Sequence, residues 1–241
     1  MPLVGFQCPD NQFAVKQIAD CEKCENRCLP IEIVRWIWDT EMVRDKDHYH
    51  NDPKVLSVTE TMRGSCLRKA YFNRTVDYTE TPQSLMARSS GTGVHKRLEQ
   101  ANDDGYSEVA LSYDLGGGYT LKGTADRLTA DYIGDYKTVD AVRKTYDLSN
   151  AEQLSIYRDM AGGVDRELVI WQVARKKVAT HVVHYVEDAF GECLDRCGLL
   201  IDTLASGQPE MLPTEGKNIK FFKMTACDFC SHVDECAAVG D

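Results

Sequence analysis

The stretch GTADRLTADYIGDYKT, residues 123–138, decides the fold, because it reads as two short strands and a turn but carries three carboxylates and a lysine. Strand interiors disfavour aspartate and lysine. Successive side chains of a strand point to opposite faces, so Asp135 and Lys137, two positions apart, project from the same side. The pattern therefore predicts a sheet that presents an acidic and a basic group at one place.

A hairpin between these two strands would bring Asp126 opposite Asp135. Two carboxylates at one point suit a hard cation such as Mg²⁺ or Mn²⁺. Lys137 would lie beside that ion, where its ammonium can meet a phosphate or a water. This equipment predicts metal-assisted hydrolysis of a phosphodiester, although spacing alone leaves a surface hairpin with a solvated ion pair equally open. Asp131 lies between the strands and is expected to be a turn former.

The segments around this hairpin predict an α/β fold. Alternating patterns indicate strands at residues 108–115, 119–128, 132–139, 167–177 and 180–187. Helical spacing marks residues 29–44, 151–162 and 192–207, and a capping box of Ser57 and Glu60 starts another helix. A helix at residues 84–102 is expected to be broken or begun near Gly91 and Gly93. The order of elements indicates a central mixed sheet flanked by helices.

Composition bounds the class of protein. Of 241 residues, 43% are apolar, which is enough for a large core with a small appended module. We find neither a run long enough for a membrane helix nor the start of a signal peptide, so we expect a cytoplasmic protein without a membrane partner. Lysine and arginine number 28 against 38 aspartates and glutamates, a net charge of -10. Bulk charge therefore cannot attract nucleic acid, and DNA would need a local basic patch or a bound cation.

Ten cysteines are too many for an ordinary intracellular enzyme. Disulfides are one interpretation, but in a reducing compartment clustered cysteines more often bind metal. Near the C-terminus, Cys227-x2-Cys230-x5-Cys236 stands together with the distant Cys66. By spacing alone these four thiols could bind either zinc or a cubane iron-sulfur cluster.

The remaining cysteines form two groups. Two of them, Cys193 and Cys197, lie four apart on a predicted helix, where core packing is expected. The N-terminal group supplies four thiols in a short span, which suits tetrahedral Zn²⁺ in a small ribbon or knuckle. In a helical alternative, some of these four would be buried free thiols. The N-terminal group consists of Cys8, Cys21, Cys24 and Cys28.

Several motifs, in matching order over about residues 57–236, resemble the nuclease core of the PD-(D/E)XK superfamily and specifically its RecB-like branch. They are Gly123–Asp126, Asp135–Thr138, a Q-x-x-x-Y helix with Gln153 and Tyr157, and Gly91–His95 followed by Glu99. The resemblance implies a restriction-endonuclease-like fold. It also favours the metal site over the surface hairpin.

The resemblance implies a set of metal ligands. Asp126 and Asp135 would be carboxylate ligands, the backbone carbonyl of Tyr136 would add a third, and His95 would complete the site. Glu108, at the head of its strand, is either a further acidic member or a solvated strand end.

It also implies a catalytic group. Lys137 would be the catalytic lysine. Gln153 and Tyr157, four apart and so on one helix face, would contact the scissile strand or support the site. The implied activity is that of a Mg²⁺- or Mn²⁺-dependent deoxyribonuclease, an exonuclease on single-stranded DNA or DNA ends, in phage or bacterial DNA recombination, repair or processing.

The cysteine layout is similar to that of the iron-sulfur subgroup of RecB-like nucleases, which includes the CRISPR-adaptation nucleases and the AddB nuclease domain. That subgroup has one cysteine before the core and three after it, and the sequence CLRKAY at residues 66–71 resembles C-x-R-x-x-[YF] around its first cysteine. The resemblance implies a [4Fe-4S] cluster that holds the fold together. Its ligands would be Cys66, Cys227, Cys230 and Cys236.

The N-terminal cysteines have no counterpart in that subgroup. A polar stretch, DKDHYHNDP at residues 45–53, separates them from the rest. We therefore predict a Cys-rich, zinc-binding module at residues 1–50 and a nuclease core at residues 51–241. The module would be an added docking site for a protein partner, which suits a phage-encoded protein.

Basic residues gather in three places that could border the metal site and follow a DNA backbone. Two other function classes stay open: a non-catalytic DNA-binding or assembly subunit that keeps the nuclease fold, and a zinc-dependent adaptor. The presence of all the motif residues speaks against the first. The basic groups are Arg143 and Lys144, residues 175–177, and Lys217, Lys220 and Lys223.

Overall fold

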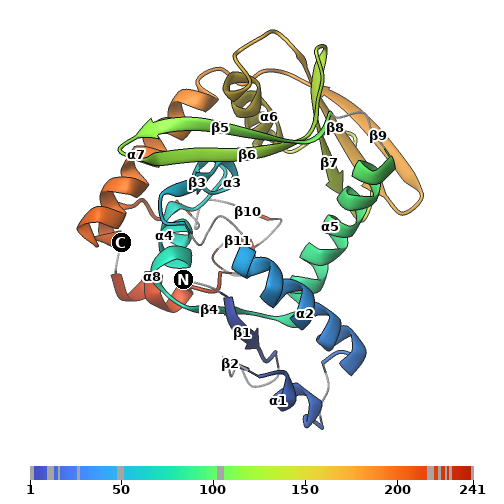
Figure 1. Cartoon of the computed structure of the whole chain (residues 1–241), viewed down its shortest axis with the longest axis vertical. Helices are drawn as coiled ribbons and strands as arrows, with labels where there is room; N and C mark the ends of the chain where they lie inside the picture. The colour runs from blue at the N-terminus through green and yellow to red at the C-terminus, as the bar shows by residue number, and fades with distance from the viewer. Residues whose placement is uncertain are drawn as a thin grey trace.

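The structure is a computed structural model of the whole chain (Figure 1). It describes residues 3–9, 14–15, 17–25, 28–47, 52–101, 106–215, 220–221, 224–225, 227 and 230–239. Several predictions fall on residues or side chains outside these ranges. They concern Glu99, Lys217, Lys220 and Lys223.

A six-stranded mixed sheet forms the centre of the molecule. The three strands predicted around the hairpin are confirmed as β5 (Ser107–Gly116), β6 (Tyr119–Leu128) and β7 (Tyr132–Thr138). β8 (Glu167–Ala174) adds in parallel to β7, and β9 (Lys177–Val183) adds in antiparallel orientation to β8. A short strand that the pattern missed, β3 (Val55–Ser57), pairs in parallel with β6. The strand order is β3-β6-β7-β8-β9, with β5 also on β6.

The β6–β7 hairpin is short and its turn is polar. Arg127 pairs with Gly134 and Leu128 with Ile133, so the register leads Asp126 toward Asp135. The Thr129 hydroxyl accepts hydrogen bonds from the backbone N–H groups of Asp131 and Tyr132. Asp131 is exposed within this turn, as predicted, but the side chain that makes the hydrogen bonds there is that of Thr129.

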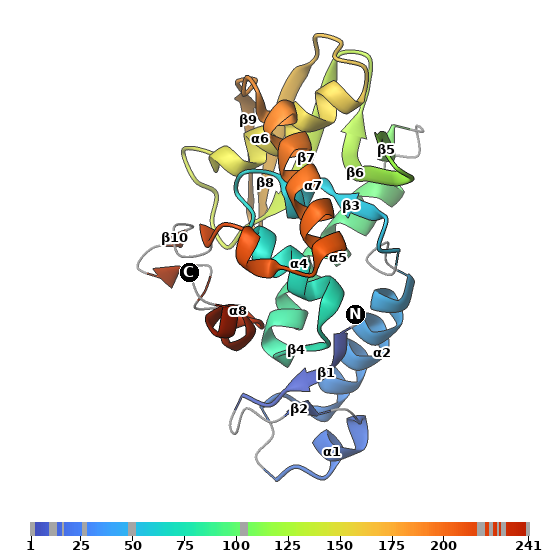
Figure 2. The same cartoon turned by 90° about the vertical axis from the view of Figure 1, so that its left-hand side faces the viewer.

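Two helices cover one face of the sheet. α6 (Leu148–Met160) contacts β5, β6, β7 and β8, and α7 (Ala189–Ser206) packs against α6. The shared core takes in Ile133, Ile170 and Leu154, together with the fully buried Cys193 and Cys197. The core prediction for these two cysteines is thus confirmed. Figure 2 shows α7 lying in front of the sheet on this side.

Short elements close the core beneath α7. Ser57 caps α3 (Val58–Thr61) with the predicted capping box, and its N–H donates to the Glu60 carboxylate. α4 (Leu67–Thr75) follows and begins directly after Cys66. Beyond α7 come a 3₁₀ turn (Pro209–Met211), the small pair β10 (Lys220–Phe221) and β11 (Met224–Thr225), and α8 (Val233–Val239).

α5 (Pro82–Ala101) approaches the sheet from the other side, where it contacts β7. It is one continuous helix, so the expected break near Gly91 and Gly93 is wrong. Among the described residues, a Cβ at either glycine would meet nothing within 4 Å. Each glycine costs a helix interior about 0.5–1 kcal/mol relative to alanine. Contacts of α5 with α2 and β7 offset this cost.

The N-terminal segment forms a small unit of its own (Figure 1). It contains β1 (Leu3–Gln7), β2 (Ala14–Val15), α1 (Ile18–Glu22) and α2 (Ile31–Asp47), the last of which confirms a predicted helix. β1 pairs with β2 and, in parallel, with β4 (Tyr78–Glu80), which directly precedes α5. No helix among the described residues is both long and apolar enough to cross a membrane.

Candidate active site

Lys137 stands at the centre of a hydrogen-bonded group, which we call the lysine group. Its Nζ lies 2.9 Å from Oδ2 of Asp135 and donates to Oε1 of Gln153 at 3.1 Å. The amide of Gln153 in turn donates to the hydroxyl of Tyr157 at 2.8 Å. The structure thus brings together four residues that the sequence singled out, and it fixes the ammonium between a carboxylate and an amide.

Asp135 is a buried carboxyl group that needs a cation. Its pKa is raised to about 6, chiefly by burial and also by the nearby Asp126, while Lys137 and His95 act to lower it. Oδ2 accepts no hydrogen bond of regular geometry within the described part of the chain, despite its short distance to the ammonium. A buried carboxylate oxygen left in this way is costly unless a positive charge compensates it. The group therefore fits a metal ligand.

A second group, the metal-facing group, lies next to it. It consists of His95 from α5, Glu108 from β5 and Asp126 from β6, whose ligand atoms all lie within 4.8 Å of one another. Asp126 accepts a 2.6 Å hydrogen bond from the backbone N–H of Tyr136, which ties it to β7. Carboxylate oxygens and an imidazole nitrogen suit Mg²⁺ or Mn²⁺. The backbone carbonyl of Tyr136 stays a predicted third ligand.

His95 and Glu108 both lie near Asp126. His95 Nδ1 lies 3.4 Å from Asp126 Oδ1, and this interaction is the main reason why the pKa of His95 is raised. Glu108 has φ of 50°, in the left-handed region that non-glycine residues rarely occupy. Such a conformation costs of order 1–3 kcal/mol and is typical of functional sites. Glu108 is exposed, so its place near His95 and Asp126 fits both interpretations, a further acidic member of the site and a solvated strand end.

The sheet and α6 are shaped around Tyr157. A Cβ at Gly123 would lie only 2.4 Å from the Tyr157 ring, so only glycine leaves room for it. Burial raises the pKa of the Tyr157 hydroxyl, which keeps it protonated. Gln153 and Tyr157 are both buried. Their place behind Lys137 is that of supports for the lysine, one of the two roles that the motif implied.

The four predicted cluster ligands line one cavity of about 310 Å³. We call them the core cysteine site. Burial raises the pKa of Cys230, and the neighbouring Cys66 and Cys227 raise it further. Residues from both ends of the core meet there, since α4 begins at the cavity and α8 ends the described chain. The site consists of Cys66, Cys227, Cys230 and Cys236.

Two further residues line this cavity: Arg68, the arginine of the motif at residues 66–71, and His232, which the sequence prediction did not include. Arg68 is buried; its Nε donates to the Leu212 carbonyl at 2.8 Å, and its Nη1 lies 3.7 Å from Cys236 Sγ. His232 is also buried, with Nε2 2.9 Å from Asn73 Oδ1 and with Nδ1 lacking a hydrogen-bond partner among the described residues. The C-x2-C-x-H spacing of residues 227–232 was the available signal for this histidine.

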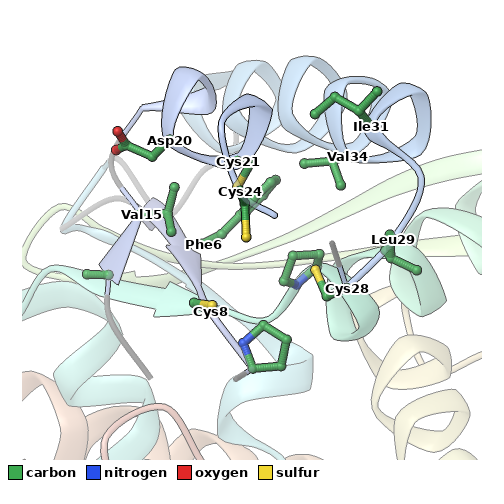
Figure 3. Close-up of a pocket in the computed structure, with 13 residues that line it drawn as sticks. Phe6, Cys8, Val15, Asp20, Cys21, Cys24, Cys28, Leu29, Ile31 and Val34 are labelled. Carbon is green, nitrogen blue, oxygen red and sulfur yellow. The ribbon is translucent and has the colours of Figure 1, made fainter. Parts of the chain in front are cut away.

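The second set of cysteines also lines a single cavity, of about 290 Å³, in the N-terminal unit (Figure 3). We call it the N-terminal cysteine site. Apolar side chains, including Phe6 and Val34, line the same cavity. The cysteines described here form no disulfide. The site consists of Cys8, Cys21, Cys24 and Cys28.

Two aromatic side chains, Tyr136 and Trp171, lie beside the metal-facing group on the α5 side of the sheet. We call them the aromatic row. The Tyr136 ring lies 6.3 Å from the His95 ring and stacks on Trp171 at 4.9 Å. Trp171 pairs across the sheet with Thr180, which has the exposed Val178 and Val182 on either side of it. Of the predicted basic groups, residues 175–177 are exposed in the β8–β9 turn at the end of the same two strands.

Two adjacent strands of a mixed sheet carry the carboxylates and the lysine, and helices cover the sheet. This arrangement defines the restriction-endonuclease-like class. The PD-(D/E)XK nuclease superfamily model matches residues 48–237, and the chain belongs to that superfamily. A nuclease function and a divalent metal follow from the family. The first 47 residues lie outside the match.

One of two reported solved structures shares the fold. The protein described as "Crystal structure of SSO0001" is 16% identical, with a TM-score of 0.61 over 87% of this chain and 98% of that chain. A "Putative exonuclease" from Eubacterium rectale is 11% identical over 67% of this chain and 86% of its own, with a TM-score of 0.38, too low to bear on the fold. No curated protein sequence matches the chain.

Proposed function

We propose that the protein is a Mg²⁺- or Mn²⁺-dependent deoxyribonuclease that works as an exonuclease on single-stranded DNA or DNA ends. The observation that carries the proposal is the fixed position of the Lys137 ammonium, held between Asp135 and Gln153 beside the metal-facing group. A non-catalytic subunit would have no need to keep this buried arrangement.

The donor set fits a hard divalent cation, which would lie among His95, Glu108, Asp126 and Asp135. When bound, such an ion supplies Lewis acidity toward a phosphoryl oxygen and makes a water more acidic. Asp126 is oriented by the Tyr136 N–H, and Asp135 by Lys137. These contacts hold the carboxylates in place before the cation arrives, so little reorganisation accompanies binding.

The lysine would act on the phosphate or on the attacking oxygen. Lys137 keeps a partly exposed side chain, whereas Gln153 and Tyr157 behind it are buried. Because Gln153 takes one hydrogen bond from the ammonium, Lys137 cannot turn freely away from the site. A fixed cation aimed at developing negative charge lowers the barrier without reorganising during the reaction.

Single strands are favoured by the aromatic row. Tyr136 and Trp171 offer faces on which bases could stack, next to the metal-facing group. Gly134 makes room for Trp171, because a Cβ there would lie 2.1 Å from its ring. Bases of a duplex are already stacked on each other, whereas unpaired bases can stack on such side chains. The basic turn at residues 175–177 would contact the DNA backbone.

The core cysteine site would hold a [4Fe-4S] cluster whose role is to tie α4 to the C-terminal segment. Four thiol ligands in a cavity between these two parts are the observation that supports it. Protein purified without oxygen should be brown and absorb near roughly 400 nm. A colourless protein that contains only zinc would contradict the cluster. The N-terminal cysteine site remains the predicted zinc site, and its module the predicted contact for a protein partner.

The nuclease proposal is tested by incubating the protein with single-stranded DNA labelled at the 5′ or 3′ end, in Mn²⁺. Asp135→Ala and Lys137→Ala should abolish cleavage while the protein stays folded. Asp131→Ala is the matched control, because it removes a carboxylate from the same hairpin but from its exposed turn, and it should cleave normally. Equal activity in all three variants would place the reaction elsewhere, and the two labels distinguish polarity and exonuclease from endonuclease action.

A further inference from the structure

The N-terminal cysteine site lies outside the part of the chain that matches the nuclease family, so the family does not explain it. Its four thiols come from four different places: the end of β1, α1, the turn after α1 and the segment before α2. The backbone N–H of Cys24 bonds to the carbonyl of Cys21 at 3.3 Å, which forms a tight turn between these two. The side chains gather around one cavity (Figure 3).

The ligand set of the site suits a metal ion. Four thiols line one cavity, together with apolar side chains such as Phe6 and Val34. The spacings Cys21-x2-Cys24 and Cys24-x3-Cys28 fall within those of structural zinc sites. No three of these sulfurs lie within 4.8 Å among the described residues. Four thiolates on one zinc lie about 3.8 Å apart, so zinc would draw them into the cavity.

The unit around this site has a small core. Among the described residues, its fully buried apolar side chains are Phe6, Val34, Ile37 and Leu85, and partly buried side chains pack around them. So small a core seldom supports a fold without a disulfide or a metal. A structural zinc would contribute directly to its folding.

This small core is shared with α5. Leu85 belongs to the first turns of α5, and Phe6 belongs to β1, so the N-terminal unit and α5 bury the same cluster. β1 also pairs with β4, with Phe6 opposite Glu80, directly before α5 begins. α2 contacts α5 as well. The N-terminal unit therefore holds the start of α5.

The far part of α5 carries His95 into the nuclease site. α5 has 20 residues, about 30 Å of helix, and spans the distance from the N-terminal unit to β7 (Figure 1). Between its anchored start and His95 lie Gly91 and Gly93, which weaken the helix and contact nothing at Cβ. Loss of the anchor at the start should therefore loosen the segment that positions His95.

We propose that the N-terminal cysteine site binds one Zn²⁺ ion, and that this zinc holds α5 so that His95 reaches the nuclease metal. His95 touches the proposed metal directly, whereas the zinc acts only through α5. The link from the zinc to His95 rests on the proposed nuclease site. The proposal that the four cysteines bind zinc is independent of that site.

Metal content tests the first half, using full-length protein purified without oxygen. The wild type should contain one zinc per chain. Cys24→Ser should lose this zinc and keep its iron, and Cys66→Ser should lose iron and keep its zinc. Cys24→His is the conservative control and should retain zinc, because histidine also ligates it. A Cys24→Ser protein with unchanged zinc, or one that loses iron instead, would overturn the zinc site.

Hydrogen exchange and Mn²⁺ binding test the second half. Cys24→Ser should exchange faster at residues 82–95 and bind Mn²⁺ about tenfold more weakly. Adding Gly91→Ala and Gly93→Ala should recover much of that loss, because both stabilise the helix. In a His95→Ala background, Cys24→Ser should cause no further loss of Mn²⁺ affinity.

Separate outcomes identify what has failed. Unchanged exchange at residues 82–95, or fully additive losses of Mn²⁺ affinity, would overturn the link through α5. If Cys24→Ser does not fold, removal of zinc from the wild type by a chelator, followed by exchange measurements, gives the same test. A wild type that binds Mn²⁺ but cleaves no DNA would overturn the nuclease function and leave the zinc result intact.

Discussion

Two helices deliver side chains to the candidate active site, and they are held in opposite ways. α6 buries every residue from Ala151 to Tyr157 and packs between the sheet and α7. α5 instead contacts α2 and β7, and its middle contains Gly91 and Gly93, where an added Cβ would meet none of the described side chains. The lysine group depends on α6, and the metal-facing group depends in part on α5.

This difference matches what each group has to do. A cation that stabilises developing charge works best when its position is fixed beforehand, and Lys137 is fixed by Gln153 and by Asp135. Metal ligands can be drawn into place by the ion itself, because binding free energy can order them. We therefore expect changes on the α6 side to affect the chemical step, and changes on the α5 side to affect metal affinity.

The largest effect should come from Lys137→Ala. At saturating Mn²⁺ the rate of single-turnover cleavage should fall by about 10²–10³ or more, as when one preorganised donor is removed. Mn²⁺ affinity should change little at a pH well above the pKa of Asp135. If raising the Mn²⁺ concentration restored the rate of this variant, changes on the α6 side would affect metal affinity, and the proposed difference between α6 and α5 would be wrong.

His95→Ala should show the reverse pattern. Loss of one ligand should weaken Mn²⁺ binding by roughly 10- to 100-fold. Cleavage should then recover when Mn²⁺ is raised to saturation, because the lysine group is intact. Isothermal titration gives the affinity, and single-turnover cleavage gives the rate. A rate that stays low at saturating Mn²⁺ would mean that His95 also acts in the chemical step.

Most of the sheet could be predicted, since alternation marks strands strongly when one face is buried. β3 was missed because three residues carry too little periodicity. The break expected in α5 was wrong for a different reason. Glycine lowers helix propensity, but contacts of α5 with α2 and β7 outweigh that local preference.

The candidate site could be predicted in its residues more than in its geometry. Asp126, Asp135 and Lys137 were marked by polar residues in good strand sequence. The positive φ of Glu108 and the burial of His232 leave no trace in a pattern of residue types, because both depend on tertiary packing. Glycine at position 123 likewise has a reason that only the Tyr157 ring reveals.

Gly123→Ala tests whether α6 is packed more tightly than α5. The new Cβ would lie 2.4 Å from the Tyr157 ring, so β6 or α6 must shift. Overpacking of this kind costs about 1–3 kcal/mol in unfolding free energy. Gly91→Ala is the matched control on α5, where the space is open, and it should be neutral or stabilising by up to about 1 kcal/mol. Urea unfolding of both variants checks this, and equal effects would mean that α6 is no more tightly packed than α5.

The smallest effect concerns pH and follows from the pKa of Asp135, about 6 and raised chiefly by burial. Below that pH the carboxyl holds a proton that a cation must displace, so Mn²⁺ affinity should fall by up to about tenfold per pH unit. The raised pKa of His95 acts in the same direction. The unfolding free energy of the metal-free protein should depend on pH in the opposite direction. Because the folded pKa of Asp135 exceeds the unfolded value of about 3.9, its unfolding free energy should fall as pH rises from about 4 to 6.

The two sides of the site should shift this pH dependence by different amounts. Lys137 is the larger of the two groups that lower the pKa of Asp135, and His95 is the smaller. Lys137→Ala should therefore move the midpoint of Mn²⁺ binding to higher pH by more than His95→Ala does. Asp135→Asn, which removes the titrating carboxyl, should flatten most of the dependence between pH 5 and 7. An equal shift in the Lys137 and His95 variants would show that the ammonium does not control the charge of Asp135, and the lysine group would then be no more preorganised than the metal-facing group.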